Sequence, residues 1–372
     1  MVALGVAAVA GMTVVAQDQK AADAKPRDRF EQSQRQEGQA ILDIADAALT
    51  GKPVPTDFQI RWQNEFLKAR QGTFVPFTLS IDVSKIGPLS ALMYVRAVPR
   101  EAGPPPRAVK SKKSSDKNRG DTPEVQYPVD AIFPVELKPE NGSVARISRG
   151  FSVAPGDYDI YIVIRERAPQ TPSMASGRGT QPKARAAVLV QPISVPNYWS
   201  GELTTSTVIL ADRLNVLSEP ISADELVERP YVIGQNDITP AADFQFRKDE
   251  ELIVVFLVYN PTVTPDKKFD IQVEYHFFRR NGPGGRADTA APAVRHPPEL
   301  EGERYFNHTD PQRFNPAIMG ASFDPSAGHP VMAGQGIPLA GFDVGDYRLA
   351  IKITDLLSGT SITRDVHFTV GS

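Results

Sequence analysis

The chain has five histidines and no cysteine, so imidazoles and carboxylates are the side chains that could catalyse a reaction or bind a transition metal. His276 and His367 lie on the polar faces of two alternating segments, and a metal site would require these strands to be neighbours. The favoured interpretation is that both face solvent. His296, His308 and His329 lack the H-x-H or H-x-x-x-H spacing of zinc sites. We therefore predict no metal and no cofactor.

Other catalytic signatures are also missing from the sequence. There is no G-x-S-x-G elbow, no P-loop and no S-x-x-K motif, so no catalytic residue is assigned. Acidic turns at Asp157, Asp343 and Asp346 could bind calcium, but calcium takes about six to eight oxygen ligands and no D-x-D-x-D-G array supplies them. Turn capping explains these aspartates better. The prediction is a protein that is not an enzyme.

The best candidate for a binding site is a long segment over residues 304–341, which is rich in glycine and proline and is predicted to be a loop. Two alternatives remain open: the segment packs as an Ω-loop over the end of a domain, or it exposes its rings to a ligand such as a sugar or a peptide. The candidate residues are Tyr305, Phe306, Arg313, Phe314 and Phe323.

A second candidate is a basic loop within residues 101–123, which could contact anionic lipid, polysaccharide or nucleic acid. The favoured alternative is a solvated connection between two strands. A formal net charge of −3 and a pI near 6.0 argue against a dedicated nucleic-acid binder, so no nucleic-acid partner is predicted. The cations of this loop are Arg107, Lys110, Lys112, Lys113, Lys117 and Arg119.

The N-terminus predicts export. Residues 2–16 carry no charge and are shorter than the roughly 20 apolar residues of a membrane-spanning helix. They fit the apolar core of a signal peptide over residues 1–16, with Val14 and Ala16 before the cleavage site and a basic region expected upstream. The alternative is an uncleaved anchor helix. We expect a periplasmic, cell-surface or secreted protein with no transmembrane span after cleavage, held by apolar packing because it has no disulfides.

Short alternating segments bounded by Gly, Pro and Asp predict an all-β fold. Residues 17–53 are expected to be a disordered and then helical segment, with the helix over 30–49. Two immunoglobulin- or fibronectin-like β-sandwich domains in tandem follow at 54–197 and 198–372, the second with long loops at 281–303 and 304–341. The clearest strand signals are the apolar run 252–259, which predicts a central strand, and a β-hairpin over residues 347–370.

A short repeat links the two predicted domains. Gly156-Asp157-Tyr158 and Gly345-Asp346-Tyr347 each precede an alternating segment near the end of a domain. Glycine suits the turn, aspartate can cap it, and tyrosine can bury its ring while its hydroxyl bonds the backbone. The alternative is coincidence, because such turns are common in β proteins.

Several of these stretches resemble accessory β-sandwich regions of uncharacterised exported bacterial proteins, some of them associated with GWxTD or von Willebrand A-related domains. The resemblance is carried by residues 74–79, 156–158, 345–349, 357–359 and 363–366. Asp82-Val83-Ser84-Lys85-Ile86 departs from the D-x-S-x-S metal loop at its last position, and no G-W-x-T-D motif occurs. The resemblance implies an exported sandwich protein and assigns no functional residue.

Three functions are therefore ranked. The leading hypothesis is an exported non-enzymatic β-sandwich protein that binds another protein or a cell-envelope component through sheet edges or loops. The alternative is a carbohydrate-binding accessory module that uses the aromatic residues of 305–323. A hydrolase without a recognisable motif is third.

Overall fold

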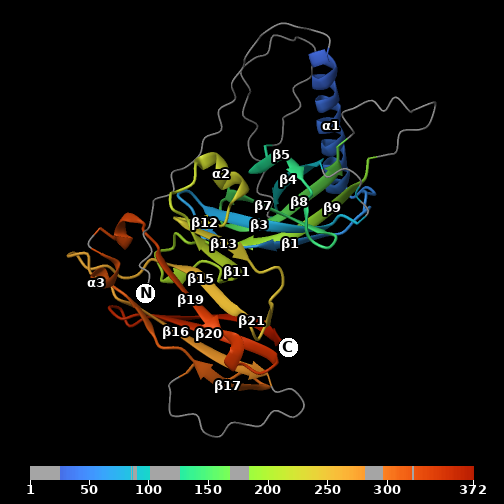
Figure 1. Cartoon of the computed structure of the whole chain (residues 1–372). Helices are drawn as coiled ribbons and strands as arrows, with labels where there is room; N and C mark the ends of the chain where they lie inside the picture. Colours follow the sequence, from blue (N-terminus) through green and yellow to red (C-terminus); the bar gives the residue numbers. More distant parts are fainter. Residues whose placement is uncertain are drawn as a thin grey trace. The chain divides into compact units, whose positions relative to one another are not determined.

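The computed structural model describes residues 26–84, 86, 90–100, 126–167, 184–280, 296–320 and 322–372, and these form two compact units (Figure 1). The N-terminal unit comprises the described residues up to Asn64 together with Gln71–Asn197. The C-terminal unit comprises Glu65–Arg70 and Tyr198–Ser372. The predicted domains at 54–197 and 198–372 differ from these units in where they place residues 65–70 and the N-terminal helix.

Some predictions fall outside the described residues. These include the signal peptide over residues 1–16, the six cations of the basic loop, and residues 281–295 of one predicted loop. Among the residues that the structure describes, no helix has the length and apolar character needed to span a membrane.

The N-terminal unit is a sandwich of two antiparallel sheets, with strand orders β1-β3-β7-β6 and β5-β4-β8-β9 (Figure 1). Alternate residues of its central strands are buried, such as Phe77 and Leu79 in one sheet and Met93 and Val95 in the other. The strands are β1 (Ile60–Asn64), β3 (Thr73–Asp82), β4 (Ser90–Pro99), β5 (Val129–Glu136), β6 (Pro139–Asn141), β7 (Val144–Val153), β8 (Gly156–Glu166) and β9 (Ala186–Val195).

The predicted helix is α1 (Pro26–Leu49), and it packs on the sheet of β4 and β8. Ile41 and Ala45 are fully buried in a cluster with Leu92, Tyr94 and Val163. The helix ends as predicted near Gly51, because this glycine has φ of 67° and the next amide donates to the carbonyl of residue 47. The helix is therefore part of the N-terminal unit and not a separate leading segment.

The C-terminal unit is a second sandwich. One sheet has the order β10-β15-β11-β13-β12 with β19 on β15, and the other has the order β14-β21-β20-β16-β17 with β18 on β16. The strands are β2 (Leu67–Lys68), β10 (Thr204–Thr205), β11 (Ile209–Val216), β12 (Val232–Ile233), β13 (Asn236–Pro240), β14 (Gln245–Arg247), β15 (Glu251–Tyr259), β16 (Ile271–Arg280), β17 (Glu303–His308), β18 (Gln312–Phe314), β19 (Val331–Pro338), β20 (Gly345–Asp355) and β21 (Ser361–Gly371). Short helices are α2 (Ala223–Glu228), α3 (Pro316–Met319), η1 (Pro325–Ala327) and η2 (Leu339–Gly341).

The strongest strand predictions for this unit are confirmed. β15 is a central strand whose two faces enter different apolar clusters, with Val254 and Phe256 on one side and Val255 on the other. The predicted hairpin is formed by β20 and β21, and Tyr347 lies opposite Phe368 in its register. The all-β sandwich fold is thus confirmed.

The predicted loop over 304–341 is wrong for much of its length. β17 and β18 extend the sheet of β16, and β19 pairs with β15 over eight residues. Glycine has a packing role here, because a Cβ on Gly334 would lie 2.7 Å from the Val254 carbonyl oxygen. The glycines that suggested a loop therefore permit close approach between strands.

Both copies of the Gly-Asp-Tyr motif have the same local geometry. β8 and β20 each begin at the motif's glycine, with φ of 142° and 152°. The Tyr158 hydroxyl donates to Ala154 O at 3.0 Å, and the Tyr347 hydroxyl donates to Asp343 O at 2.8 Å. The aspartates accept from the next strand: Asp157 Oδ1 from Ser194 Oγ at 2.5 Å and Asp346 Oδ1 from Thr369 Oγ1 at 2.7 Å. Each motif therefore closes a turn and joins two strands.

Candidate functional site

The two edges of strand β21 have different partners. One edge pairs with β20 along the whole strand, from Ser361 to Val370. The other edge pairs in parallel with β14 only over Thr369–Gly371. Since the sheet ends at β14, most of this second edge has no neighbouring strand in the described part of the chain.

Backbone alternation identifies the groups on this edge. The Thr369 N–H donates to Phe244 O at 2.8 Å, away from β20, and every second residue of a strand faces the same side. Four further residues of β21 share this direction, and their backbone groups have no backbone partner among the described residues. They define the open edge: Ser361, Thr363, Asp365 and His367. The side chains of all four are exposed, so the edge is accessible to solvent.

Arg364 lies on β21 between two residues of the open edge, and its side chain points toward the other sheet of the sandwich. Its guanidinium donates to Thr205 Oγ1 at 2.9 Å and Thr204 Oγ1 at 3.2 Å, and so connects the two sheets. It also donates to the Thr363 carbonyl at 3.2 Å, a hydrogen bond from a side chain to the backbone of the open edge. A strand that added to β21 would therefore lie beside this arginine and would compete with its exposed hydrogen bond to Thr363.

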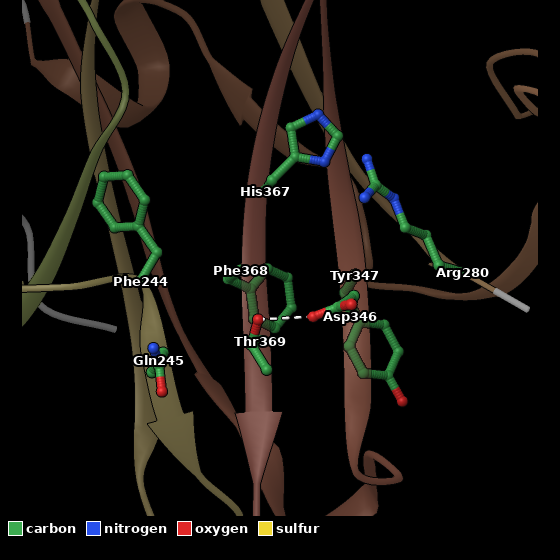
Figure 2. A pocket seen from close by; sticks show the side chains of 8 residues that line it. All are labelled: Phe244, Gln245, Arg280, Asp346, Tyr347, His367, Phe368 and Thr369. Atoms are coloured by element: carbon green, nitrogen blue, oxygen red, sulfur yellow. Dashed lines mark hydrogen bonds between the residues drawn. The ribbon is translucent and has the colours of Figure 1, made fainter. Parts of the chain in front are cut away.

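A shallow pocket of about 330 Å³ lies where β14 ends the open edge (Figure 2). Tyr347 and Phe368 lie among its lining residues with stacked rings, 5.4 Å between centroids. Arg280 and His367 line the pocket from the outer face of the sheet, and Figure 2 shows the guanidinium extending toward the imidazole. The full lining is Phe244, Gln245, Arg280, Asp346, Tyr347, His367, Phe368 and Thr369. Tyr347 and Phe368 belong to the core and are almost fully buried, so the accessible lining is the exposed Phe244 ring together with polar side chains.

The five aromatic and arginine candidates do not form one exposed surface. Phe306, Phe314 and Phe323 pack against or within the main core, and Phe323 is 8% exposed. Arg313 is exposed and forms a two-pronged ion pair with Asp270. Tyr305 lies on the outer face of the sheet, where it stacks on His296 with 4.3 Å between centroids. These placements agree with the packing alternative more closely than with a set of exposed rings.

The sequence interpretation identified neither the open edge nor Arg280, and it named His367 only as a solvent-facing residue, which the structure places on that edge. Arg280 ends an alternating segment as one of two consecutive arginines, which gives no distinguishing pattern. The available signal was the polar pattern of residues 361–367, because exposed polar alternate residues are typical of a strand at the edge of a sheet.

Comparisons with known proteins give limited similarity. No family model matches the chain, and no curated protein matches it. Among the solved structures that show likeness are a mutant Salmonella alpha-2-macroglobulin and trypsin-activated alpha-2-macroglobulin from Escherichia coli. Each has 10% sequence identity and a TM-score of 0.19 over 86% of this chain. The chain spans 15% and 17% of those two chains.

His276 lies in a histidine–tyrosine cluster on the outer face of β16 and β17. The prediction that it faces solvent is wrong, because it is 2% exposed beneath neighbouring rings. His308 lies opposite it in the register, with 6.3 Å between ring centroids, and Tyr305 bonds His308 Nδ1 at 2.8 Å. Neither ring nitrogen of His276 has a hydrogen-bond partner among the described residues. Within those residues, no group of three or more His, Asp or Glu could hold a metal ion.

The cluster predicts acid sensitivity. Burial lowers the pKa of His276 below 6.5, His308, His296 and Lys352 act in the same direction, and Glu274 opposes them. The unfolded chain then binds the proton more readily, so the free energy of unfolding should fall as the pH drops below about 6.5. Leucine cannot take up this proton. In His276→Leu, the free energy of unfolding measured with urea should therefore depend less on pH between pH 7 and 5. An unchanged slope would show that His276 does not carry the effect.

Proposed function

We propose that the chain is an exported, non-enzymatic protein that binds another protein by accepting one of its extended segments as an added strand on the open edge of β21. The observation that carries this proposal is the incomplete cover of β21, which leaves the outward backbone groups of four alternate residues without a backbone partner in the described chain. Main-chain hydrogen bonds to such an edge give affinity, and neighbouring pockets give selectivity.

The position of β14 supports this mode of binding. β14 is a short segment from another part of the chain that already pairs with the same edge, in parallel, at Thr369–Gly371. The geometry of β21 therefore accommodates a partner strand on this side. An incoming segment would continue the line of β14 along residues 361–367.

The alternative of carbohydrate binding has less support. Sugar-binding surfaces present aromatic faces to solvent, whereas Phe306, Phe314 and Phe323 contact the core of the C-terminal unit. Tyr305 has its ring stacked on His296. A protein ligand for the open edge therefore explains more of the observed geometry.

Blocking one outward N–H tests the proposal. Thr363→Pro removes an N–H that faces away from β20. The hydrogen bonds between β20 and β21 remain, because the alternate residues of β21 make them. Random linear peptides displayed on phage should be selected by the wild-type protein. Thr363→Pro should weaken their binding about tenfold, the value of one lost hydrogen bond together with a steric block.

The matched control is Thr363→Ala, which keeps the N–H and removes only the exposed side chain. It should bind the selected peptides as the wild type does. Amide exchange in β20 would confirm that the proline variant keeps the hairpin. Equal binding by the proline variant, or failure of the wild type to select any peptide, would overturn the proposal.

A further inference from the structure

The pocket beside the open edge is lined by a cation that has no ion-pair partner in the described part of the chain. Arg280 is exposed and forms no ion pair among the described residues. Of the carboxylates near it, Glu303 pairs with Arg348, and Asp346, which lines the same pocket, accepts a hydrogen bond from Thr369 through one oxygen.

A second donor lies on the open edge itself, at the end nearest the pocket. His367 is exposed on β21 and lines the same pocket. An added strand would lie about 4.8 Å beyond β21, so its outward side chains would lie beside His367. A glutamate side chain on the added strand that extends across β21 would place its carboxylate between the imidazole of His367 and the guanidinium of Arg280.

The end of the edge fixes where such a side chain would be. Phe244 and β14 occupy the edge from Thr369 onward, so an added strand must stop or turn at the pocket. The residue of the partner that lies opposite His367 is therefore the last one that pairs with β21. Its side chain meets the polar donors of the pocket and the ring of Phe244.

We infer that the segment bound by the open edge is acidic, and that a carboxylate side chain near the end of its paired stretch is held by Arg280 and His367. This inference rests on the proposed function and adds the chemistry of the partner. A carboxylate accepts from a guanidinium through charge-assisted hydrogen bonds, which are stronger than neutral ones. Because salt screens the attraction between the partner's carboxylate and Arg280, binding should weaken as salt is added.

The test uses peptides selected on the wild-type protein from the random library. Selected sequences should contain Asp or Glu at one fixed position. Replacing that residue by Gln or Asn should weaken binding about three- to tenfold, as expected for a partly exposed charged pair. Arg280→Gln should weaken binding by a similar factor, and the two changes together should cost little more than either alone.

The matched control is Arg213→Gln, an exposed arginine on β11 in the other sheet, which should leave binding unchanged. If Thr363→Pro weakens binding but Arg280→Gln and the neutral peptide do not, the acidic preference is wrong and strand addition stands. If the peptides ignore Thr363→Pro, or none is selected, both proposals fail. Thr363→Pro therefore tests strand addition, and Arg280→Gln tests the acidic preference of the bound segment.

Discussion

Glu303→Gln should destabilise the C-terminal unit by about 3 kcal/mol, because it breaks a buried ion pair and leaves the partner charge in place. Arg348 Nε and Glu303 Oε2 lie 2.9 Å apart, and their side chains are 2% and 3% exposed. The guanidinium also lies 4.2 Å from the centre of the Phe278 ring. A neutral amide in place of the carboxylate would leave this arginine with less compensation in a site that excludes water.

Two further contacts of Arg348 limit the loss. Its Nη1 pairs with Asp365 at 2.9 Å and its Nη2 donates to the Pro298 carbonyl at 3.1 Å. Asp365 is 43% exposed, so this second pair contributes less than about 1 kcal/mol. For that reason the expected loss lies at the lower end of the range of about 3–5 kcal/mol for broken buried pairs.

Urea unfolding of the full chain measures the effect, with Asp365→Asn as the matched control on the same arginine. The control should lose less than about 1 kcal/mol. The double variant Glu303→Gln with Arg348→Met should regain part of the stability, because no charge then remains buried. Equal losses in the control and in Glu303→Gln would contradict this account.

The sequence predicts those parts of the fold that depend on local periodicity. In β20 and β21, apolar residues alternate with polar ones, and the two strands form the expected hairpin. In β15 a run of apolar residues marks a strand covered on both faces. α1 follows the spacing that buries Ile41 and Ala45 together.

The same reasoning fails where pairing is not local. β17 contains Arg304, Tyr305, Phe306 and Asn307, which do not alternate by polarity, and its pairing with β16 is interrupted by an irregularity next to Phe278. Tyr305 and Phe306 consequently face opposite sides of the sheet, one toward histidines and one toward the core. A ring set inferred from neighbouring positions therefore separates in the folded unit.

The open edge could not be predicted from the sequence for a related reason. Whether β21 has a neighbour depends on β14, which lies more than a hundred positions earlier in the chain and covers only its end. Arg280 becomes notable only because the fold places it in the pocket at the end of this edge, while Glu303, opposite it in the register, pairs with Arg348. Such properties depend on the order of strands in the sheet, which the hydrophobic periodicity of a single segment does not determine.

Ile41→Ala should destabilise the N-terminal unit by about 3 kcal/mol, since it opens a cavity between α1 and the sheet of β4 and β8. Ile41 is fully buried against Leu92, Tyr94 and Val163. The loss cannot exceed the docking free energy of the helix, because α1 can detach once its contacts weaken. Two ion pairs at the same surface oppose detachment: Arg96 with Asp46 at 2.9 Å and Arg167 with Glu37 at 3.2 Å.

Native-state hydrogen exchange on the full chain distinguishes loss of the helix from loss of the unit. In Ile41→Ala, amides of α1 should exchange faster than those of β4, because the helix opens before the sheet. Asp43→Ala is the control on an exposed turn of the same helix, and it should change stability by less than about 0.5 kcal/mol. Equal protection of α1 in both variants would mean that the helix does not depend on this apolar contact, and that it should be counted as a segment apart from the N-terminal unit.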